Sequence, residues 1–183
     1  MSDGASLREL LLERSVQRGD FVLASGRRST YYIDCRRTTM SAQGMVLIGR
    51  LGLQAIGDAG WRPQAIGGLT LGADPVAYAI SAASYLAGQP VDAFSVRKEP
   101  KGHGTRRLIE GNFQSGDRVV VVEDVITSGE SAARAAAVIE EAGGSVLGIL
   151  AVVDREEGGR EALQARGRKV VSLTGVTELG LKS

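Results

Sequence analysis

Short apolar runs and longer stretches with helical spacing alternate along this chain. The short runs predict strands at residues 21–23, 30–34, 64–68, 91–96, 118–123, 145–154 and 170–174. Helical spacing of apolar positions predicts helices at residues 6–17, 41–58, 74–86, 131–142 and 160–166. The alternation predicts an α/β fold with a central, mainly parallel sheet flanked by helices. The first helix and the two short strands that follow it lie outside this repeat.

Two boundaries carry further signals. Asp74 and Pro75 have the residue types preferred at the N-cap and first position of a helix, so the helix is predicted to begin there. Residues 97–111 show no apolar period and contain several glycines, which predicts one long loop.

Composition narrows the classes of protein. A chain of 183 residues with 43% hydrophobic residues is expected to form one domain, residues 1–183, with a substantial core. The net charge of +1 gives no argument for a nucleic-acid partner. One cysteine and one histidine exclude an internal disulfide and a cysteine or histidine metal cluster. No signal peptide or apolar membrane span is evident, so we expect no membrane partner and a cytoplasmic location.

The segment from Val119 to Ser131 carries the strongest chemical signal. Four valines predict a strand buried on both faces, and the acids Glu123 and Asp124 follow them. A loop of hydroxyl residues and a glycine then leads into an Ala-rich helix. Backbone N–H groups at such a helix start bind anions, most often phosphate. The acids are placed for sugar hydroxyls or a metal ion, so the pattern indicates a site for a ribose 5-phosphate.

Other interpretations of this segment are a nucleotide-binding strand end and an ordinary turn without a ligand. The first needs a glycine-rich phosphate loop of the G-x-x-x-x-G-K-[ST] type, which does not occur in the chain. The whole segment instead resembles the signature of the type I phosphoribosyltransferases. The resemblance implies that the site for the phosphoribosyl diphosphate includes Glu123, Asp124, Val125, Ile126, Thr127, Ser128, Gly129, Glu130 and Ser131.

The long loop is strongly basic, with five basic residues and one acid between residues 97 and 107. By composition it could be a solvated loop, a patch for RNA, or a loop that closes over a polyanion. Its order of residues is similar to the catalytic loop of the orotate phosphoribosyltransferases. The resemblance assigns diphosphate contacts to Arg97, Lys98, Lys101 and His103, and catalytic roles to Lys101, His103 and Asp124. It also implies a homodimer whose subunits share active sites.

The acceptor base is indicated by residues elsewhere. Arg155 follows the predicted strand 145–154 at the sheet edge that holds the phosphate loop, and a guanidinium suits a planar carboxylate. A surface ion pair with Glu156 or Glu157 is the other interpretation. The resemblance assigns orotate contacts to Arg155 and Thr127. It also places residues 25–32 and the backbone near Tyr32 and Ile33 at the base site, within an N-terminal hood formed mainly by residues 1–40. An ordinary hairpin packed on the core remains possible for that segment.

The chain departs from the family pattern at two places. Many members have a lysine where this chain has Ala24, and another in the loop that here reads 70–75. Contacts to the diphosphate are then expected from the basic loop and from the backbone of residues 71–73.

The resemblance implies that ribose 5-phosphate passes from 5-phosphoribosyl 1-diphosphate to orotate in pyrimidine biosynthesis. The cofactor would be Mg²⁺, carried by the substrate near Glu123 and Asp124 without direct protein ligands. Two alternatives stay open, an enzyme of this fold that uses a purine or uracil, and a regulator that senses the metabolite and binds nucleic acid.

Overall fold

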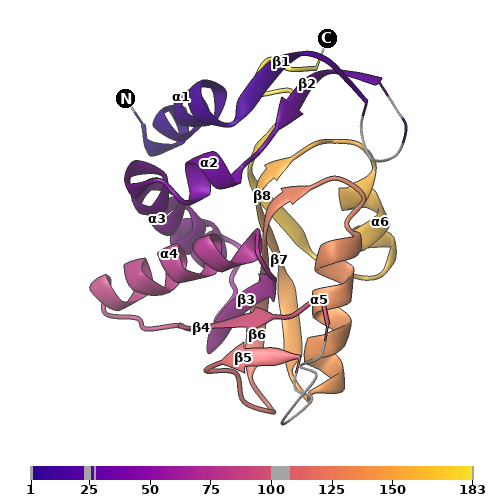
Figure 1. The fold of residues 1–183 in the computed structure, drawn as a ribbon. Coiled ribbons are helices and arrows are strands. Elements are labelled where there is room, and N and C mark those ends of the chain that lie inside the picture. Colours follow the sequence, from indigo (N-terminus) through magenta and orange to yellow (C-terminus); the bar gives the residue numbers. More distant parts are fainter. Residues whose placement is uncertain (1, 23–25, 27, 100–107, 183) are drawn as a thin grey trace.

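The computed structural model describes residues 2–22, 26, 28–99 and 108–182. Its main sheet has six strands in the order β5-β4-β3-β6-β7-β8 (Figure 1). The strands are β3 (Ala65–Leu69), β4 (Asp92–Val96), β5 (Ile109–Gly111), β6 (Arg118–Ile126), β7 (Ser145–Asp154) and β8 (Val170–Gly175). All neighbouring strands pair in parallel except β5, which is antiparallel to β4. The predicted α/β class with a mainly parallel sheet is confirmed.

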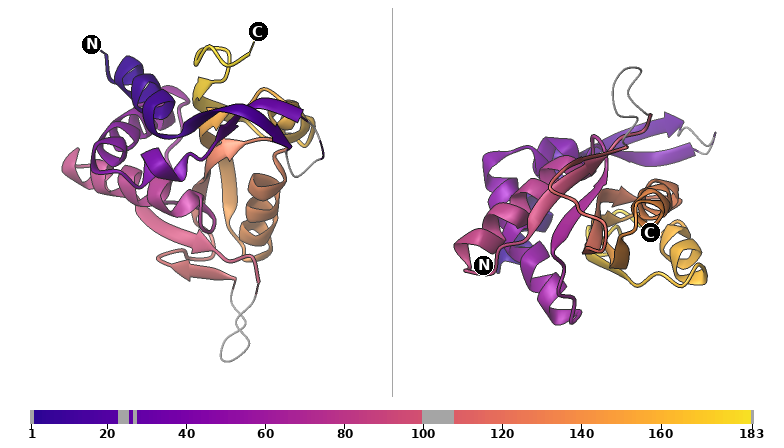
Figure 2. Two further views of the ribbon diagram at one scale, coloured as in Figure 1. Left: turned by 45° about the horizontal axis from the view of Figure 1, so that its top comes forward. Right: turned by 90° about the horizontal axis from the view of Figure 1, so that it is seen from below.

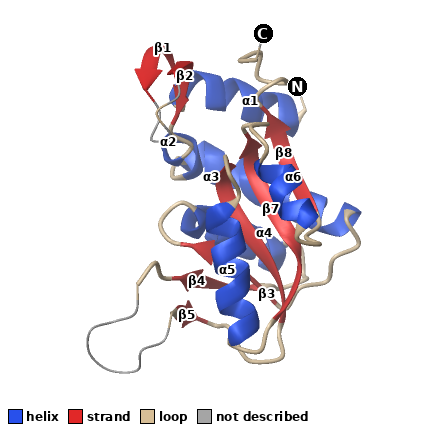
Figure 3. Cartoon of the chain, turned by 90° about the vertical axis from the view of Figure 1, so that its right-hand side faces the viewer, coloured by secondary structure: helices blue, strands red, loops and turns tan. Residues whose placement is uncertain are grey.

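Helices cover both faces of this sheet (Figure 2). One face carries α3 (Ala42–Asp58) and α4 (Ala73–Leu86), and the other carries α5 (Glu130–Glu141) and α6 (Gly159–Ala165), which stand in front of the sheet in Figure 3. The valines of β6 alternate between two apolar clusters, with Val120 and Val122 on the α3–α4 side and Val119 and Val121 on the α5 side. All four are fully buried. Burial of the central strand β6 therefore fixes the position of Glu123 and Asp124 near its carboxyl end, and of the loop that follows it.

The N-terminal hood consists of α1 (Asp3–Arg14), β1 (Val16–Val22), β2 (Arg28–Ile33) and α2 (Arg36–Thr39). It lies at one end of the sheet, at the top of Figure 1. Leu7, Leu10 and Leu11 of α1 belong to the same apolar cluster as α3 and α4. A buried hydrogen bond of 2.7 Å joins the hydroxyls of Ser15 and Thr38. These contacts fix the β1–β2 hairpin over the carboxyl ends of the central strands.

Several predicted boundaries in the hood are wrong. The first helix ends at Arg14 instead of residue 17, because Val16 pairs with Ile33 at the start of β1. Both hairpin strands begin earlier than the predicted ranges 21–23 and 30–34, and the short helix α2 was not predicted. Helical spacing continued past Ser15, so the spacing alone could not locate the change to a strand.

Three further corrections concern the main sheet. Residues 97–111 are not one loop, since 109–111 form the edge strand β5. Strand β6 continues to Ile126, so Glu123 and Asp124 lie inside the strand. Helix α4 is capped by Gly72 instead of Asp74, whose carboxylate accepts hydrogen bonds of 2.7 Å from the hydroxyls of Thr70 and Ser95. Asp74 thus ties the loop before α4 to β4.

In the part of the chain that the structure describes, no helix combines the length and the apolar character that a membrane crossing requires.

Candidate active site

The acidic pair lies near the carboxyl end of β6. Glu123 and Asp124 are 7% and 9% exposed, and the Oε2 atom of Glu123 has no hydrogen-bond partner among the described residues. Burial, followed by the charge of Asp124, raises the pKa of Glu123 to about 9. Burial also raises the pKa of Asp124, although the N–H of Val125 donates to its Oδ1 at 2.9 Å. Two buried carboxyls with space beside them can accept hydroxyl groups or meet a cation.

The raised pKa of Glu123 predicts a pH-dependent stability. Its ordinary pKa is 4.5 and its folded value is about 9. The folded state therefore binds more protons than the unfolded state between these values, so this carboxyl destabilises the ligand-free fold as pH rises through that window. We expect the Tm to fall from pH 6 to pH 9 in a thermal scan, and to fall less in Glu123→Gln. Equal slopes in the two proteins would contradict the burial of a protonated Glu123.

The predicted phosphate loop follows directly. Residues 127–129 connect β6 to α5, residues 130 and 131 begin the helix, and Gly129, with φ +79°, caps it. A small cavity of about 70 Å³ is lined by Glu123 and by residues 125–132. The N-terminal N–H groups of a 12-residue helix and the hydroxyls of the loop surround this cavity, which suits an anion of phosphate size.

Position 129 needs a glycine for two reasons, its positive φ and the lack of space for a side chain. A Cβ at this position would lie 2.8 Å from the carbonyl oxygen of Gly159 and 2.8 Å from Cγ of Leu163. We expect Gly129→Ala to weaken binding of 5-phosphoribosyl 1-diphosphate by about tenfold or more, measured by calorimetric titration, because the loop must move. Gly116→Ala is the matched control: Gly116 has φ +95° but open space around its Cβ position. The control should lose stability and keep its affinity; equal affinity in both variants would contradict the role of the loop.

A second loop reaches the acids from β3. A Cβ on Gly72 would lie only 2.5 Å from Oδ1 of Asp124, so the backbone of the 70–73 loop packs against this carboxylate. Its Thr70–Leu71 peptide is cis. This is the backbone predicted to contact the diphosphate, and the structure places it beside the acidic pair.

Arg155 lies next to the start of the phosphate loop. Its N–H donates to the carbonyl of Ile126, the last residue of β6, at 3.0 Å. Its side chain is 7% exposed, and its guanidinium carbon lies 5.3 Å from the ring centroid of Tyr31. Nη2 is 2.8 Å from Oε1 of Glu157, yet neither Nε nor Nη2 has a well-oriented hydrogen bond among the described residues. Arg155 and Glu157 therefore form an ion pair whose geometry does not suit a hydrogen bond. Nε and Nη2 of Arg155 can still donate to another acceptor.

The hood supplies the opposite wall. The ring of Tyr31 lies over the guanidinium of Arg155. Burial raises the pKa of the Cys35 thiol; the charge of Asp124 raises it further, and the charge of Arg155 lowers it. The side chain of Tyr32 instead packs on Phe21, with 5.8 Å between ring centroids. The contact of Tyr31 with Arg155 and the approach of Gly72 to Asp124 were missed by sequence reasoning. Both join segments far apart in the sequence, so no local pattern could reveal them.

The stem of the basic loop is described, but Lys101 and His103 lie outside the described residues, as does Ala24. The N–H of Arg97 donates to the carbonyl of Leu108 at 2.8 Å, and its guanidinium lies 3.8 Å from the carboxylate of Glu110. The charge of Lys98 lowers the pKa of Glu123, although burial and Asp124 outweigh it. Lys98 therefore lies within electrostatic reach of the acidic pair.

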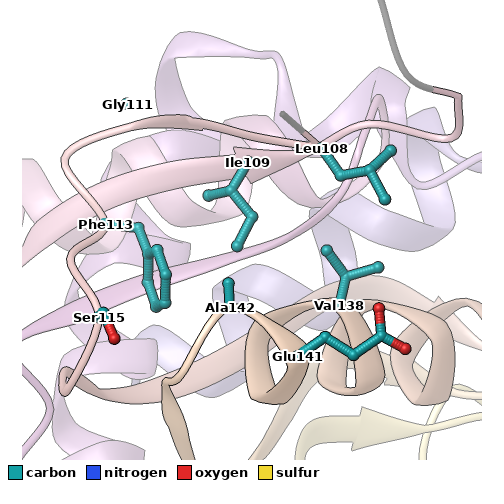
Figure 4. A pocket seen from close by; sticks show the side chains of 8 residues that line it. All are labelled: Leu108, Ile109, Gly111, Phe113, Ser115, Val138, Glu141 and Ala142. Carbon is teal, nitrogen blue, oxygen red and sulfur yellow. The ribbon is translucent and has the colours of Figure 1, made fainter. Parts of the chain in front are cut away.

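A larger hollow of about 530 Å³ lies between β5 and α5, and neither the acidic pair nor Arg155 lines it (Figure 4). Leu108, Ile109, Phe113 and Val138 form most of its wall, and Glu141 is the charged residue that lines it. Apolar walls with a carboxylate do not suit a phosphate, so the candidate site remains the acidic pair, the two loops and Arg155.

Comparisons with known proteins agree with this geometry. No protein-family model matches the chain. The orotate phosphoribosyltransferase of Mycobacterium tuberculosis is 48% identical over 179 residues, which cover 98% of this chain and 97% of that protein. The enzyme of the same name from Aquifex aeolicus is 45% identical over 182 residues and 98% of both chains. A crystal structure of the Mycobacterium tuberculosis enzyme with 5-phospho-α-D-ribosyl 1-diphosphate superposes with a TM-score of 0.84, at 44% identity over 98% of this chain and 100% of that one. The chain belongs to the orotate phosphoribosyltransferase family.

Proposed function

We propose that this protein transfers the 5-phosphoribosyl group of 5-phosphoribosyl 1-diphosphate to orotate, in the synthesis of pyrimidine nucleotides. The products are orotidine 5′-phosphate and diphosphate. The observation that carries the proposal is the buried guanidinium of Arg155, with two donors that lack a hydrogen bond, next to the phosphate loop and the acidic pair. Orotate has the carboxylate that such a cation selects, whereas uracil and the purines do not.

The proposed chemistry joins N1 of orotate to C1′, breaks the bond between C1′ and the diphosphate oxygen, and releases the N1 proton of orotate to the diphosphate or to solvent. Positive charge then develops on the ribosyl ring, as in glycoside hydrolysis, and negative charge grows on the leaving diphosphate. Asp124 and Glu123 bind the ribose hydroxyls near the positive ring. The N–H groups and hydroxyls of residues 127–131 hold the 5′-phosphate.

Contacts to the leaving group come from the basic loop. Arg97 and Lys98 leave β4 at the same sheet edge, and the family resemblance adds Lys101 and His103. Cations at this point stabilise the charge that grows in the transition state. Thr127 and Arg155 bind the base, with the ring of Tyr31 behind the guanidinium.

Mg²⁺ fits this arrangement as an ion carried by the substrate. The described residues contain no group of three or more side chains that could hold a metal, whereas Glu123 and Asp124 offer two carboxyls beside the phosphate loop. When bound, the ion supplies positive charge to the diphosphate oxygens.

A homodimer with shared sites is part of the proposal. Tyr85 and Leu86 at the end of α4 are 74% and 87% exposed, and Met45 and Val46 of α3 add to the apolar surface. A hollow of about 810 Å³ lies between these two helices. Apolar surface of this kind supports a protein interface.

Shared active sites can be tested by mixing two inactive variants, Lys101→Ala and Asp124→Asn. If sites are shared, some mixed dimers have one intact site and activity should recover. No recovery after proven subunit exchange would exclude sharing.

The remaining proposals concern organisation and location. Leucines of α1 share one apolar cluster with α3 and α4, which supports residues 1–183 as one domain with the hood built in. The free thiol of Cys35 is compatible with the reducing cytoplasm, where we place the enzyme.

The decisive experiment follows the ultraviolet absorbance of orotate after addition of 5-phosphoribosyl 1-diphosphate and Mg²⁺, with uracil and hypoxanthine in parallel. We expect rapid loss of orotate and none of the other bases. Turnover of uracil or hypoxanthine instead would assign a different acceptor to the same fold. Absence of any turnover, with the sugar diphosphate still bound, would favour a regulator.

A further inference from the structure

Three acids flank Arg155, and each has a different cation or donor as its partner. Asp154 lies 2.6 Å from Nε of Arg160, and Glu156 accepts a hydrogen bond from the hydroxyl of Thr177. The third, Glu157, lies 2.8 Å from Nη2 of Arg155 itself. Of these three, only Glu157 forms an ion pair with the cation that we assign to the base carboxylate.

The loop that carries Glu157 is firmly held. Glu156 has φ +51°, in the left-handed region, and its N–H donates to Oδ1 of Asp154 at 2.8 Å. Its carbonyl accepts from Nζ of Lys182 at 3.2 Å. Bonds on both sides fix the backbone at residue 156, so the next residue is directed toward Arg155 instead of solvent.

Arg155 is buried, Glu157 is partly buried, and the two side chains are poorly aligned. The side chains of Arg155 and Glu157 are 7% and 16% exposed, so an unpaired guanidinium here would be costly. Glu157 supplies the opposite charge, yet Nη2 and Nε still lack a well-oriented hydrogen bond among the described residues. A ligand carboxylate that meets Nε and Nη2 in the bidentate manner would be a better partner for the same edge of the guanidinium.

We propose that Glu157 competes with the carboxylate of the base for Arg155 and so sets the affinity of the acceptor subsite. In the ligand-free enzyme Glu157 neutralises the buried guanidinium, and binding of the nucleotide carboxylate displaces it. The inference rests on the proposed function, since it concerns the acceptor subsite of that reaction. Its consequence is that a ligand carboxylate must displace Glu157, so part of the affinity gained at Arg155 is offset by the loss of this pair. A base without a carboxylate leaves the internal pair in place.

The test compares two nucleotides that differ only in that carboxylate, orotidine 5′-phosphate and uridine 5′-phosphate. Their Kd values are measured by calorimetric titration of the full-length wild-type protein and Glu157→Gln. We expect the variant to bind orotidine 5′-phosphate about threefold to tenfold more tightly, because the competing charge is gone. The Kd for uridine 5′-phosphate should change less than about twofold, so the ratio of the two Kd values isolates the carboxylate.

Glu156→Gln is the matched control. It removes the same charge at the neighbouring position, where the side chain contacts Thr177 and forms no ion pair with Arg155. This control should leave the ratio of the two Kd values nearly unchanged. If Glu157→Gln does not fold, Glu157→Asp decides: its shorter side chain keeps the charge, retreats from Nη2, and should shift the ratio less but in the same direction.

An unchanged or weaker preference for orotidine 5′-phosphate in the Glu157 variant would overturn the proposal, and weaker binding would make Glu157 a residue that positions Arg155. Failure of the proposed function would look different. The wild-type protein would then bind both nucleotides alike and would not consume orotate.

Discussion

We expect Asp124→Asn to lower the kcat of orotate phosphoribosylation by about 100-fold to 1000-fold with little change in fold. The carboxylate would lose its charge next to a ribose ring that becomes positive, and hydrogen bonds to a charged group are each worth about 1.5–3 kcal/mol. The fold should persist because the amide oxygen of asparagine can still accept the hydrogen bond that Val125 donates to Oδ1.

The measurement is steady-state turnover of orotate at saturating substrates, with circular dichroism and the Tm as tests of folding. Asp92→Asn is the control, because Asp92 is exposed and starts β4 at the opposite edge of the sheet. It should keep wild-type turnover. Activity near the wild-type value in folded Asp124→Asn would remove Asp124 from the catalytic residues and leave Glu123 as the acid that binds ribose.

The central strand and its loop were predictable because local rules agree there. Four consecutive valines need burial on both faces, and the structure buries Val119 and Val121 on one side and Val120 and Val122 on the other. The glycine at the helix start has the positive φ that such a turn requires. The position of Arg155 beside the loop followed from strand order, since β6 and β7 are parallel neighbours.

Other features depend on contacts that no local pattern records. Asp74 has the residue type of an N-cap, but its carboxylate bonds to Thr70 and Ser95, which outweighs the local preference. The edge strand β5 is only three residues long and exists because β4 pairs with it. The sequence allowed an ion pair between Arg155 and either Glu156 or Glu157. The backbone conformation at Glu156 selects Glu157.

We expect the second large effect at the acceptor subsite. Arg155→Met should raise the KM for orotate by about 100-fold or more, while the KM for 5-phosphoribosyl 1-diphosphate changes little. A bidentate guanidinium–carboxylate contact in a buried site contributes roughly 2–4 kcal/mol, and its loss also leaves the ligand carboxylate without a cation. The flat, apolar contact with Tyr31 survives, since a methionine side chain can pack on the same ring.

Initial rates over a range of each substrate check this expectation, with Arg166→Met as the control, because that residue lies exposed beyond α6. The control removes the same charge from the surface and should leave both KM values unchanged. The added substitution Glu157→Gln removes the second member of the ion pair with Arg155 and should not restore orotate binding. If Arg155→Met kept the wild-type KM for orotate, the cation would serve the fold through Glu157, and recognition of the base would have to come from Thr127 and the hood.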